Sequence, residues 1–363
     1  MKHIQHKKSF AQINSVASQF ISDDSIMFDI ETTGFVKNSC IIYLIGTLRK
    51  EGNSILIDQF LAESKSDEEL LLQEFSALMK TRNTYITFNG VRFDVPFVQE
   101  RCKHYGLENC FYHKKSFDIY LEIRPYKNIL KLPNYKQKTI EDFLDIHRED
   151  PFTGGDLIEV FKEYCHTHHP HLEKALLIHN YEDVLGMLDL FPILTYKKFL
   201  EGAFTVTDID THSYTSYDGI EQKEVIITMN NQVTLPREVS FSNDEIYIHL
   251  GKETSRIRIP LLEGTLYHFF PNYKDYYYLP KEDMAIHKSV AEFVDKEYRQ
   301  KAKPSNCYTP MTGQFLPQYE PIITPCFHKC HKDSISYFSY TVETFDSTDI
   351  LSKYVEHLLN STT

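Results

Sequence analysis

The chain has 363 residues, enough for two ordinary domains with buried cores, and we expect two. Its hydrophobic content of 42% and charged content of 25% are typical of a soluble globular protein. No segment approaches the roughly 20 apolar residues of a membrane span, so the composition excludes an integral membrane protein and predicts no membrane partner.

The formal net charge of −12 argues against a protein that coats nucleic acid through bulk electrostatics. The charge is unevenly distributed, because residues 101–150 hold 10 basic and 8 acidic side chains. This region is locally positive, and a protein that contacts a polyanion at one place needs no more than such a patch.

The seven cysteines are odd in number and irregularly spaced, without a Cys-x-x-Cys pair, so we expect reduced thiols rather than a disulfide framework. The first residues are basic but lack the apolar stretch of a secretory signal. Both features predict a cytoplasmic protein.

The first half of the chain has an α/β pattern. After a helix-like opening segment, turn residues separate three expected strands, and the apolar spacing then predicts a helix. Strands alternating with helices follow. The expected strands are 25–30, 40–48, 53–60, 84–88 and 115–120, and the expected helices are 66–80, 94–105 and several between 139 and 200.

The sequence texture changes near Gly202. Short alternating runs at 225–229, 245–250 and 256–259 predict antiparallel strands, followed by one helix over 287–301 and a tail rich in Pro and aromatic residues. We therefore expect an α/β domain over residues 1–202 and a β-rich accessory domain over 203–363.

Four acidic side chains stand out in three short motifs. Asp29 and Glu31 are two residues apart in an expected strand, so they point to the same face while Ile30 points to the other. Asp94 ends the motif Asn89-Gly-Val-Arg-Phe-Asp94, and Asp183 lies four residues after His179 on an expected helix. That spacing places His179 and Asp183 on one helix face.

Clustered carboxylates repel one another unless a cation lies between them. Hard divalent ions such as Mg²⁺ and Mn²⁺ prefer carboxylate and water ligands. Four acids can hold two such ions, as in two-metal phosphoryl-transfer sites, where one ion activates water and the other stabilises the leaving oxygen. We therefore predict that Asp29, Glu31, Asp94 and Asp183 are catalytic metal ligands, and that His179 orients or deprotonates the attacking water.

The motifs resemble those of the DEDD exonucleases of the ribonuclease H-like superfamily. Phe28-Asp-Ile-Glu31 matches the first motif, Asn89-x-x-x-Phe93-Asp94 the second, and Asp183 closes the third. Segments 132–144 and 179–184 are further similar to a YprB-like predicted exonuclease family, itself similar to the proofreading domains of family-B DNA polymerases. The resemblance covers about residues 20–200. It implies a mixed ribonuclease H-like sheet flanked by helices, and 3′-to-5′ hydrolysis of a nucleic-acid strand with two Mg²⁺ or Mn²⁺ ions.

One position departs from the family pattern. The polymerase-like branch has Tyr four residues before the final Asp, and the other branch has His five residues before it. Here His179 occupies the four-residue position and residue 178 is Ile. The resemblance therefore predicts the metal ligands, and the general-base role of His179 is a separate prediction.

Other residues in the motifs are candidates for contacts with substrate. Gly34 permits close approach of a nucleotide to the backbone, although turn geometry alone would also explain it. Phe93 can stack on a terminal base or pack in the core. Asp118 ends an expected strand and can support the site or act structurally. The predicted substrate-binding set is Thr32, Thr33, Gly34, Asn89, Phe93 and Asp118.

Three other segments have two interpretations each. Residues 124–138 interleave tyrosines with basic side chains, as in a single-strand groove, or form a solvated basic loop. The Cys/His-rich segments 165–171 and 326–331 contain zinc-type ligands, but both fit surface loops. The aromatic run 267–278 suits a contact with a base or a protein partner, or ordinary packing.

The motifs together favour a metal-dependent 3′-to-5′ exonuclease that acts on the 3′ end of single-stranded DNA or RNA. A non-catalytic module that binds nucleic acid or protein on the same fold is one alternative. A structure-specific endonuclease or oligonucleotide phosphodiesterase is another, and a circular strand distinguishes it, because an exonuclease needs an end.

Overall fold

The structure, a computed structural model, describes residues 1–148, 152, 154–243, 245–345 and 347–361. Contacts divide the chain into two compact units, Met1–Lys197 and Lys198–Thr363. The predicted boundary lies after Gly202, and the extent of the two domains as folding units stays a prediction. In the described part of the chain, each helix is too short or too polar to cross a membrane.

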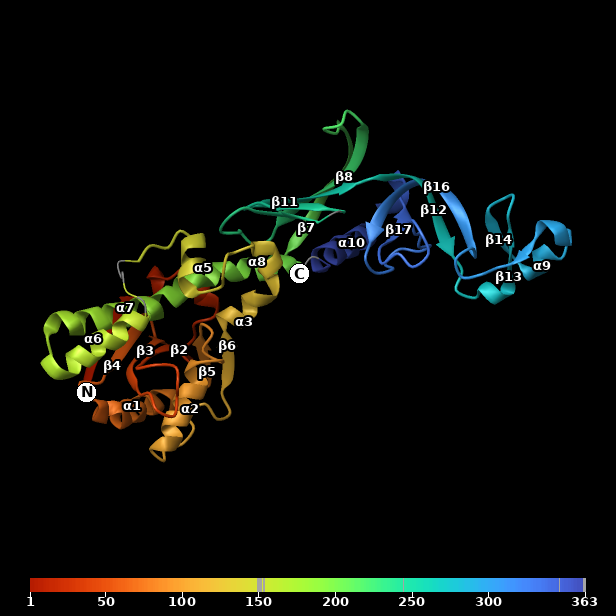
Figure 1. The fold of residues 1–363 in the computed structure, drawn as a ribbon. Helices are drawn as coiled ribbons and strands as arrows, with labels where there is room; N and C mark the ends of the chain where they lie inside the picture. Colours follow the sequence, from red (N-terminus) through yellow and green to blue (C-terminus); the bar gives the residue numbers. More distant parts are fainter. Residues whose placement is uncertain (149–151, 153, 244, 346, 362–363) are drawn as a thin grey trace. The chain divides into compact units, whose positions relative to one another are not determined.

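The first unit is built on a six-stranded mixed sheet (Figure 1). Its strands are β1 (Lys2–Ser9), β2 (Ser25–Thr32), β3 (Ile42–Glu51), β4 (Ser54–Leu61), β5 (Thr84–Thr87) and β6 (Lys115–Asp118). Their order is β1-β4-β3-β2-β5-β6, and β5 and β6 extend the sheet in parallel from β2. The remaining pairings are antiparallel. The motif strand β2 is thus central in the sheet.

Helices cover both faces of this sheet. The helices of this part of the chain are α1 (Glu68–Lys80), α2 (Asp94–His104), α3 (Ile119–Ile123), α4 (Lys127–Leu130), α5 (Gln137–Phe143), α6 (Gly154–Thr167), α7 (Pro170–Leu190) and α8 (Leu194–Leu200). On one face of β2, Phe28 contacts Phe75 of α1 at 5.0 Å between ring centroids. On the other, Asp29 contacts Asn180 of α7. The core therefore fills one face while the acids point toward α7.

The predicted fold class is confirmed for this unit, with one local error. The expected strands and helices lie within a few residues of their predicted positions. The opening segment, expected to be helix-like, is instead strand β1. It pairs with β4 from Lys2 opposite Leu61 to Ser9 opposite Ser54. The ladder satisfies backbone groups along β4 that would otherwise form an open edge, a long-range effect that local spacing does not reveal.

The second unit is rich in antiparallel strands, as predicted. One sheet has the order β7-β8-β11-β10-β9, and two three-stranded sheets have the orders β12-β16-β17 and β14-β13-β15. The strands are β7 (Phe204–Thr215), β8 (Glu221–Asn231), β9 (Val239–Ser242), β10 (Tyr247–Leu250), β11 (Thr254–Pro260), β12 (Leu262–Phe269), β13 (Tyr276–Leu279), β14 (Met284–His287), β15 (Gln300–Lys301), β16 (Tyr308–Gln318) and β17 (Ser336–Ser339).

One helix prediction in this unit is wrong, and one helix was not predicted. The helix expected over 287–301 is limited to α9 (Lys288–Ala291), because Val290 and Phe293 are 57% and 89% exposed and no apolar face is buried beyond Ala291. The tail contains α10 (Thr348–Asn360), which the sequence reading left out. Its buried residues recur at helical spacing, at Leu351, Tyr354, Val355, Leu358 and Leu359.

Candidate functional site

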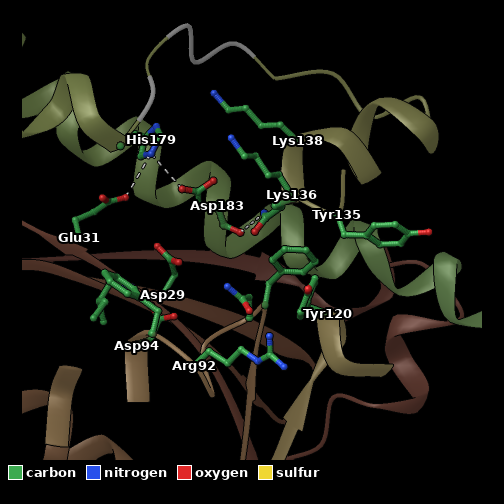
Figure 2. Close-up of a pocket in the computed structure, with 16 residues that line it drawn as sticks. Asp29, Glu31, Arg92, Asp94, Tyr120, Tyr135, Lys136, Lys138, His179 and Asp183 are labelled. Carbon is green, nitrogen blue, oxygen red and sulfur yellow. Dashed lines mark hydrogen bonds and ion pairs between the residues drawn. The ribbon is translucent and has the colours of Figure 1, made fainter. Parts of the chain in front are cut away.

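The four predicted acids come from three elements of the first unit and face one another (Figure 2). Asp29 and Glu31 lie on the same face of β2, next to an irregularity in the pairing with β3 at Glu31 and Thr32. Asp94 is the first residue of α2 and is 6% exposed, and its Oδ1 accepts a hydrogen bond of 3.3 Å from the Ile30 N–H. Asp183 lies on α7. The structure thus brings together all four predicted metal ligands.

His179 joins this group from one helical turn before Asp183. Its Nε2 lies 3.2 Å from Asp183 Oδ2 and 3.4 Å from Glu31 Oε1. Ligand atoms of His179, Glu31 and Asp183 all lie within 4.8 Å of one another, a spacing that a single metal ion can bridge. The side chain of His179 is buried, so the imidazole belongs to the acidic centre and not to the outer surface.

Burial and neighbouring acids disfavour the ionised form of two acids in the centre. Burial, together with the charges of Asp183, Asp94 and Glu31, raises the pKa of Asp29 well above its usual value, although Arg148 acts in the opposite direction. Burial raises the pKa of Asp94 to about 7, against the effect of two backbone hydrogen bonds. Both acids therefore resist ionisation near neutral pH unless additional positive charge is supplied.

These residues fit divalent cations. The donor set consists of carboxylate oxygens with one imidazole, which suits Mg²⁺ or Mn²⁺. Burial and the neighbouring acids raise the pKa values of Asp29 and Asp94, and bound cations would lower them. Asp29, Glu31, Asp94 and Asp183 are the residues that would hold them.

A cleft of about 870 Å³ opens over the acidic centre. Figure 2 shows acids and His179 along one part of it, and basic and aromatic side chains along another. Its lining outside the acidic centre is Ile30, Phe88, Asn89, Arg92, Phe93, Tyr120, Tyr135, Lys136, Gln137, Lys138 and Gly154. The arrangement places acids that can bind cations next to groups that can bind phosphates and bases.

The predicted substrate-binding residues divide into two groups. Asn89 and Phe93 line the cleft. Thr32, Thr33 and Gly34 are outside its described lining and build a turn, in which Thr32 Oγ1 donates to the Gly34 carbonyl at 2.9 Å and Thr33 Oγ1 accepts from the Ile41 N–H at 3.0 Å. A direct role of these three residues in binding stays a prediction.

Asp118 supports the backbone next to the cleft through hydrogen bonds. It is 3% exposed, and its carboxylate accepts hydrogen bonds from the N–H groups of Asn89, Val91, Tyr120 and Leu121, at 2.8 to 3.4 Å. Asn89 has a φ of 59°, and the bond to Asp118 holds that strained backbone. These bonds favour the supporting role over contact with substrate.

The basic segment 124–138 contributes only in part. Tyr135, Lys136 and Lys138 line the cleft, whereas Arg124, Tyr126, Lys127 and Lys131 are absent from its described lining. The Cys/His-rich segments do not form metal clusters, because Glu31, His179 and Asp183 are the one such group found among the described residues.

Two supporting residues escaped the sequence reading. Asn180 is fully buried on α7, donates to Asp29 Oδ2 at 3.3 Å and accepts from Gln59 Nε2 at 3.0 Å, so it helps orient Asp29. Its place between His179 and Asp183 was a usable signal. Arg148, which forms an ion pair with Asp183, is 35 residues away along the chain, and local spacing does not predict a contact at that separation.

A comparison with protein-family models agrees with this fold. Residues 26–195 match the family model RNase_H_2, described as RNase_H superfamily. A search of curated proteins finds no match to this chain.

Among solved structures, the family B DNA polymerase of the archaeon Pyrobaculum calidifontis is similar to this chain. The alignment covers 47% of this chain and 25% of the polymerase, at 17% identity and a TM-score of 0.38. Exonuclease I of E. coli, in complex with a dT13 oligonucleotide, is also similar. That alignment covers 57% of this chain and 55% of exonuclease I, at 9% identity and a TM-score of 0.35. The alignments thus span about a quarter and about half of these proteins.

The family match includes β2, α2 and α7, which carry the acidic centre, and the mixed sheet has helices on both faces. Residues 26–195 therefore have a ribonuclease H-like fold, and they carry the acidic centre.

Proposed function

We propose that this protein is a 3′-to-5′ exonuclease of the YprB-like group, which hydrolyses phosphodiester bonds at the 3′ end of a DNA or RNA strand. The observation that carries the proposal is the convergence of Asp29, Glu31, Asp94 and Asp183 at one cleft. Two bound Mg²⁺ or Mn²⁺ ions would supply an activated water and stabilise the leaving oxygen. The side chains of the cleft would hold the strand in line with them.

The lining of the cleft suits a single strand. Arg92, Lys136 and Lys138 can neutralise phosphates, and Phe93 and Tyr135 offer rings on which bases can stack, each worth about 1–3 kcal/mol in single-strand binding. Phe35, which is 86% exposed, contacts Phe93 edge to face, with 6.1 Å between the ring centroids. Stacking on rings tolerates any base, which suits an enzyme that degrades strands of varied sequence.

His179 is the general-base candidate, and its replacement is expected to separate turnover from metal binding. Because Nε2 lies beside Glu31 and Asp183, the imidazole can accept a proton from water held at these acids. We expect His179→Ala to lower kcat by about 10²–10⁴-fold, the usual contribution of general acid–base catalysis, with Mn²⁺ affinity retained. Single-turnover kinetics and calorimetric Mn²⁺ titration measure the two quantities.

The same titration distinguishes a second role for His179. A loss of Mn²⁺ affinity equal to the loss of turnover would make the imidazole a metal ligand. Unchanged kinetics of His179→Ala across the pH range would rule out the general-base role.

Metal binding is expected to release protons near neutral pH. Asp29 and Asp94 have raised pKa values, that of Asp94 being about 7, so the metal-free centre retains protons that cation binding displaces. The apparent Mn²⁺ affinity should therefore rise as pH rises through about 7. Calorimetry in two buffers of different ionisation enthalpy measures the protons released, and Asp94→Asn should release fewer.

The same pKa shifts make the stability of the metal-free protein depend on pH. An acid whose pKa is raised on folding contributes stability that is fully present below its unfolded value of 3.8 and is lost as pH rises through about 7. In EDTA the first unit should lose thermal stability across this window, and Mn²⁺ should restore it most on the alkaline side. A melting temperature independent of both pH and Mn²⁺ would contradict this account of the centre.

The intact set of four acids favours an enzyme over a purely binding module on the same fold. Tight oligonucleotide binding without Mn²⁺ affinity or cleavage would favour the module. Cleavage of a circular single strand would instead identify an endonuclease.

A further inference from the structure

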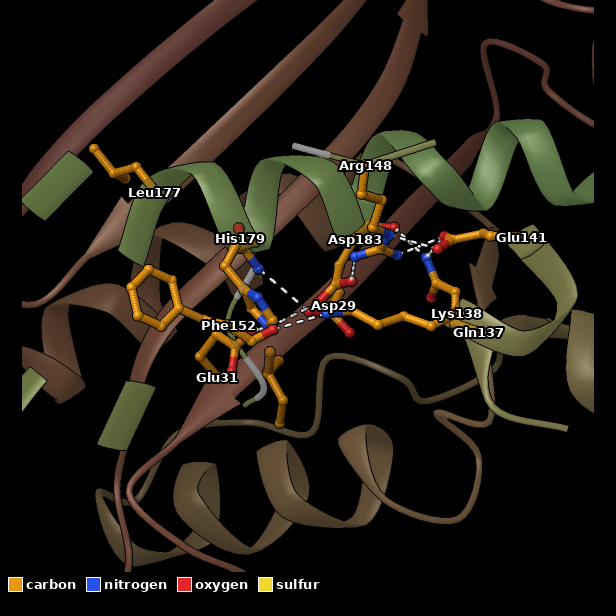
Figure 3. Close-up of polar contacts among 12 residues, drawn as sticks. Asp29, Glu31, Gln137, Lys138, Glu141, Arg148, Phe152, Leu177, His179 and Asp183 are labelled. Carbon is orange, nitrogen blue, oxygen red and sulfur yellow. Dashed lines mark hydrogen bonds and ion pairs between the residues drawn. The ribbon is translucent and has the colours of Figure 1, made fainter. Parts of the chain in front are cut away.

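Arg148 lies beside the acidic centre and contacts two acids at once (Figure 3). Its Nη1 forms an ion pair with Asp183 Oδ1. Its Nε and Nη2 bond Glu141 Oε2 and Oε1, each at 2.5 Å. A guanidinium group presents these donors in one rigid plane. The bonds to Glu141 therefore also fix the orientation in which the guanidinium meets Asp183.

Glu141 is a firm anchor for this arginine. It lies on α5 and is 1% exposed, and its Oε1 also accepts from Gln137 Nε2 at 2.9 Å. The same Gln137 amide donates to the Asp183 main-chain carbonyl at 3.0 Å, so α5 is attached to α7 at the residue that carries the acid.

A glycine in the middle of α7 makes room for this cluster. A Cβ at Gly186 would lie 2.6 Å from Glu141 Oε1 and 3.4 Å from Arg148 Nη2. Glycine is among the least favourable residues in a helix interior. Its presence here permits the close approach of the Glu141 carboxylate to α7, because any other side chain would require that carboxylate to shift.

The two oxygens of Asp183 have different partners. Oδ1 accepts from Arg148, whereas Oδ2 lies 3.2 Å from His179 Nε2, on the side of Glu31. Asp183 lines the cleft, but Arg148 and Glu141 are absent from its described lining. Arg148 thus holds the oxygen of Asp183 that is not directed at His179.

We propose that Arg148, anchored by Glu141, is a positioning residue that holds the Asp183 carboxylate in the orientation required to bind a divalent cation. The inference rests on the proposed function, since it concerns one of the proposed metal ligands. Groups that hydrogen-bond a ligating carboxylate from outside commonly change metal affinity or activity 10- to 100-fold. Arg148 has this relation to Asp183.

Arg148→Lys in the full-length protein tests the proposal. Lysine keeps the positive charge but cannot bridge two carboxylates with a rigid fork. Calorimetric Mn²⁺ titration should show a dissociation constant about 10-fold higher than in the wild type. Turnover at saturating Mn²⁺ should fall, while KM for a single-stranded oligonucleotide should change less than about twofold, because Arg148 is outside the described lining of the cleft.

Arg101→Lys is the matched control. Arg101 also forms a buried fork with a glutamate, Glu68, at 2.8 and 2.6 Å, and it is absent from the described lining of the cleft. It should cost stability without changing Mn²⁺ affinity. Glu141→Gln is a second variant that keeps Arg148 but weakens its anchor, and it should raise the Mn²⁺ dissociation constant in the same direction.

The outcomes separate this inference from the proposed function. If the wild type binds Mn²⁺, Asp183→Asn loses it and Arg148→Lys binds like the wild type or more tightly, the positioning role is overturned and the metal site stands. If the wild type does not bind Mn²⁺, the proposed function fails and the inference fails with it. A weaker affinity in Arg148→Lys and Glu141→Gln but not in Arg101→Lys supports the inference.

Discussion

Asp29→Asn is expected to lower the rate of strand cleavage by at least about 10³-fold, equivalent to about 4 kcal/mol of transition-state stabilisation. Asp29 lies among the other three acids, whose charges add to burial in raising its pKa. The amide removes one anionic ligand from a centre that would hold two divalent ions, and in-line transfer requires both. Rates at saturating Mn²⁺ and Mn²⁺ titration measure the effect.

Asp189→Asn is the matched control for this loss. Asp189 is an exposed acid on the same helix as Asp183, and it is absent from the described lining of the cleft. Its neutralisation should leave the cleavage rate within about twofold, since surface substitutions away from functional features usually have small effects. Full activity of Asp29→Asn would remove the carboxylate centre from the mechanism.

Gly46→Ala is expected to disturb both stability and activity, although Gly46 carries no chemistry. Gly46 lies opposite Asp29 in the β2–β3 pairing, beneath α7. An added Cβ would lie 2.2 Å from Asn180 Oδ1 and 2.6 Å from Val184 Cγ2. Both atoms belong to side chains of α7, so these side chains, or the helix that carries His179 and Asp183, must shift. Overpacking of this kind costs about 1–3 kcal/mol of stability.

Thermal unfolding and the cleavage rate at a temperature where the variant is folded measure the two effects. Gly313→Ala is a suitable control, because a Cβ on that strand glycine would meet no atom closer than 3.9 Å. In Gly46→Ala the additional change Asn180→Ala should recover part of the stability but not the activity, since Asn180 also bonds Asp29. A Gly46→Ala protein as stable and active as the wild type would contradict the tight approach of α7 to β3.

The acidic centre could be predicted from the sequence because its members obey local geometry. The two-residue spacing of Asp29 and Glu31 and the four-residue spacing of His179 and Asp183 place each pair on one face, whatever the tertiary fold. The same local regularity identified the strands and helices of the sheet in the first unit. Spacing alone does not predict that the two pairs and Asp94 lie in one site. That prediction came from the resemblance of the motifs to a known family.

The elements that escaped prediction depend on contacts between distant parts of the chain. β1 is a strand because β4 offers an edge about 50 residues later. Arg148 reaches Asp183 through the packing of α5 against α7, and Gly46 and Gly186 matter through side chains on neighbouring elements. The helix over 287–301 failed for the opposite reason, since its local spacing was not supported by a surface to bury Val290 and Phe293.

A time course on 5′-labelled linear single-stranded DNA and RNA, resolved to single nucleotides, tests the central claim most directly. Wild type and Asp29→Asn are compared with Mn²⁺, with Mg²⁺ and in EDTA, beside a circular strand. The account predicts a metal-dependent ladder that shortens from the 3′ end, is absent in Asp29→Asn and leaves the circular strand intact. Cleavage that persists in EDTA or in Asp29→Asn, or no cleavage of either nucleic acid with either metal, would contradict it.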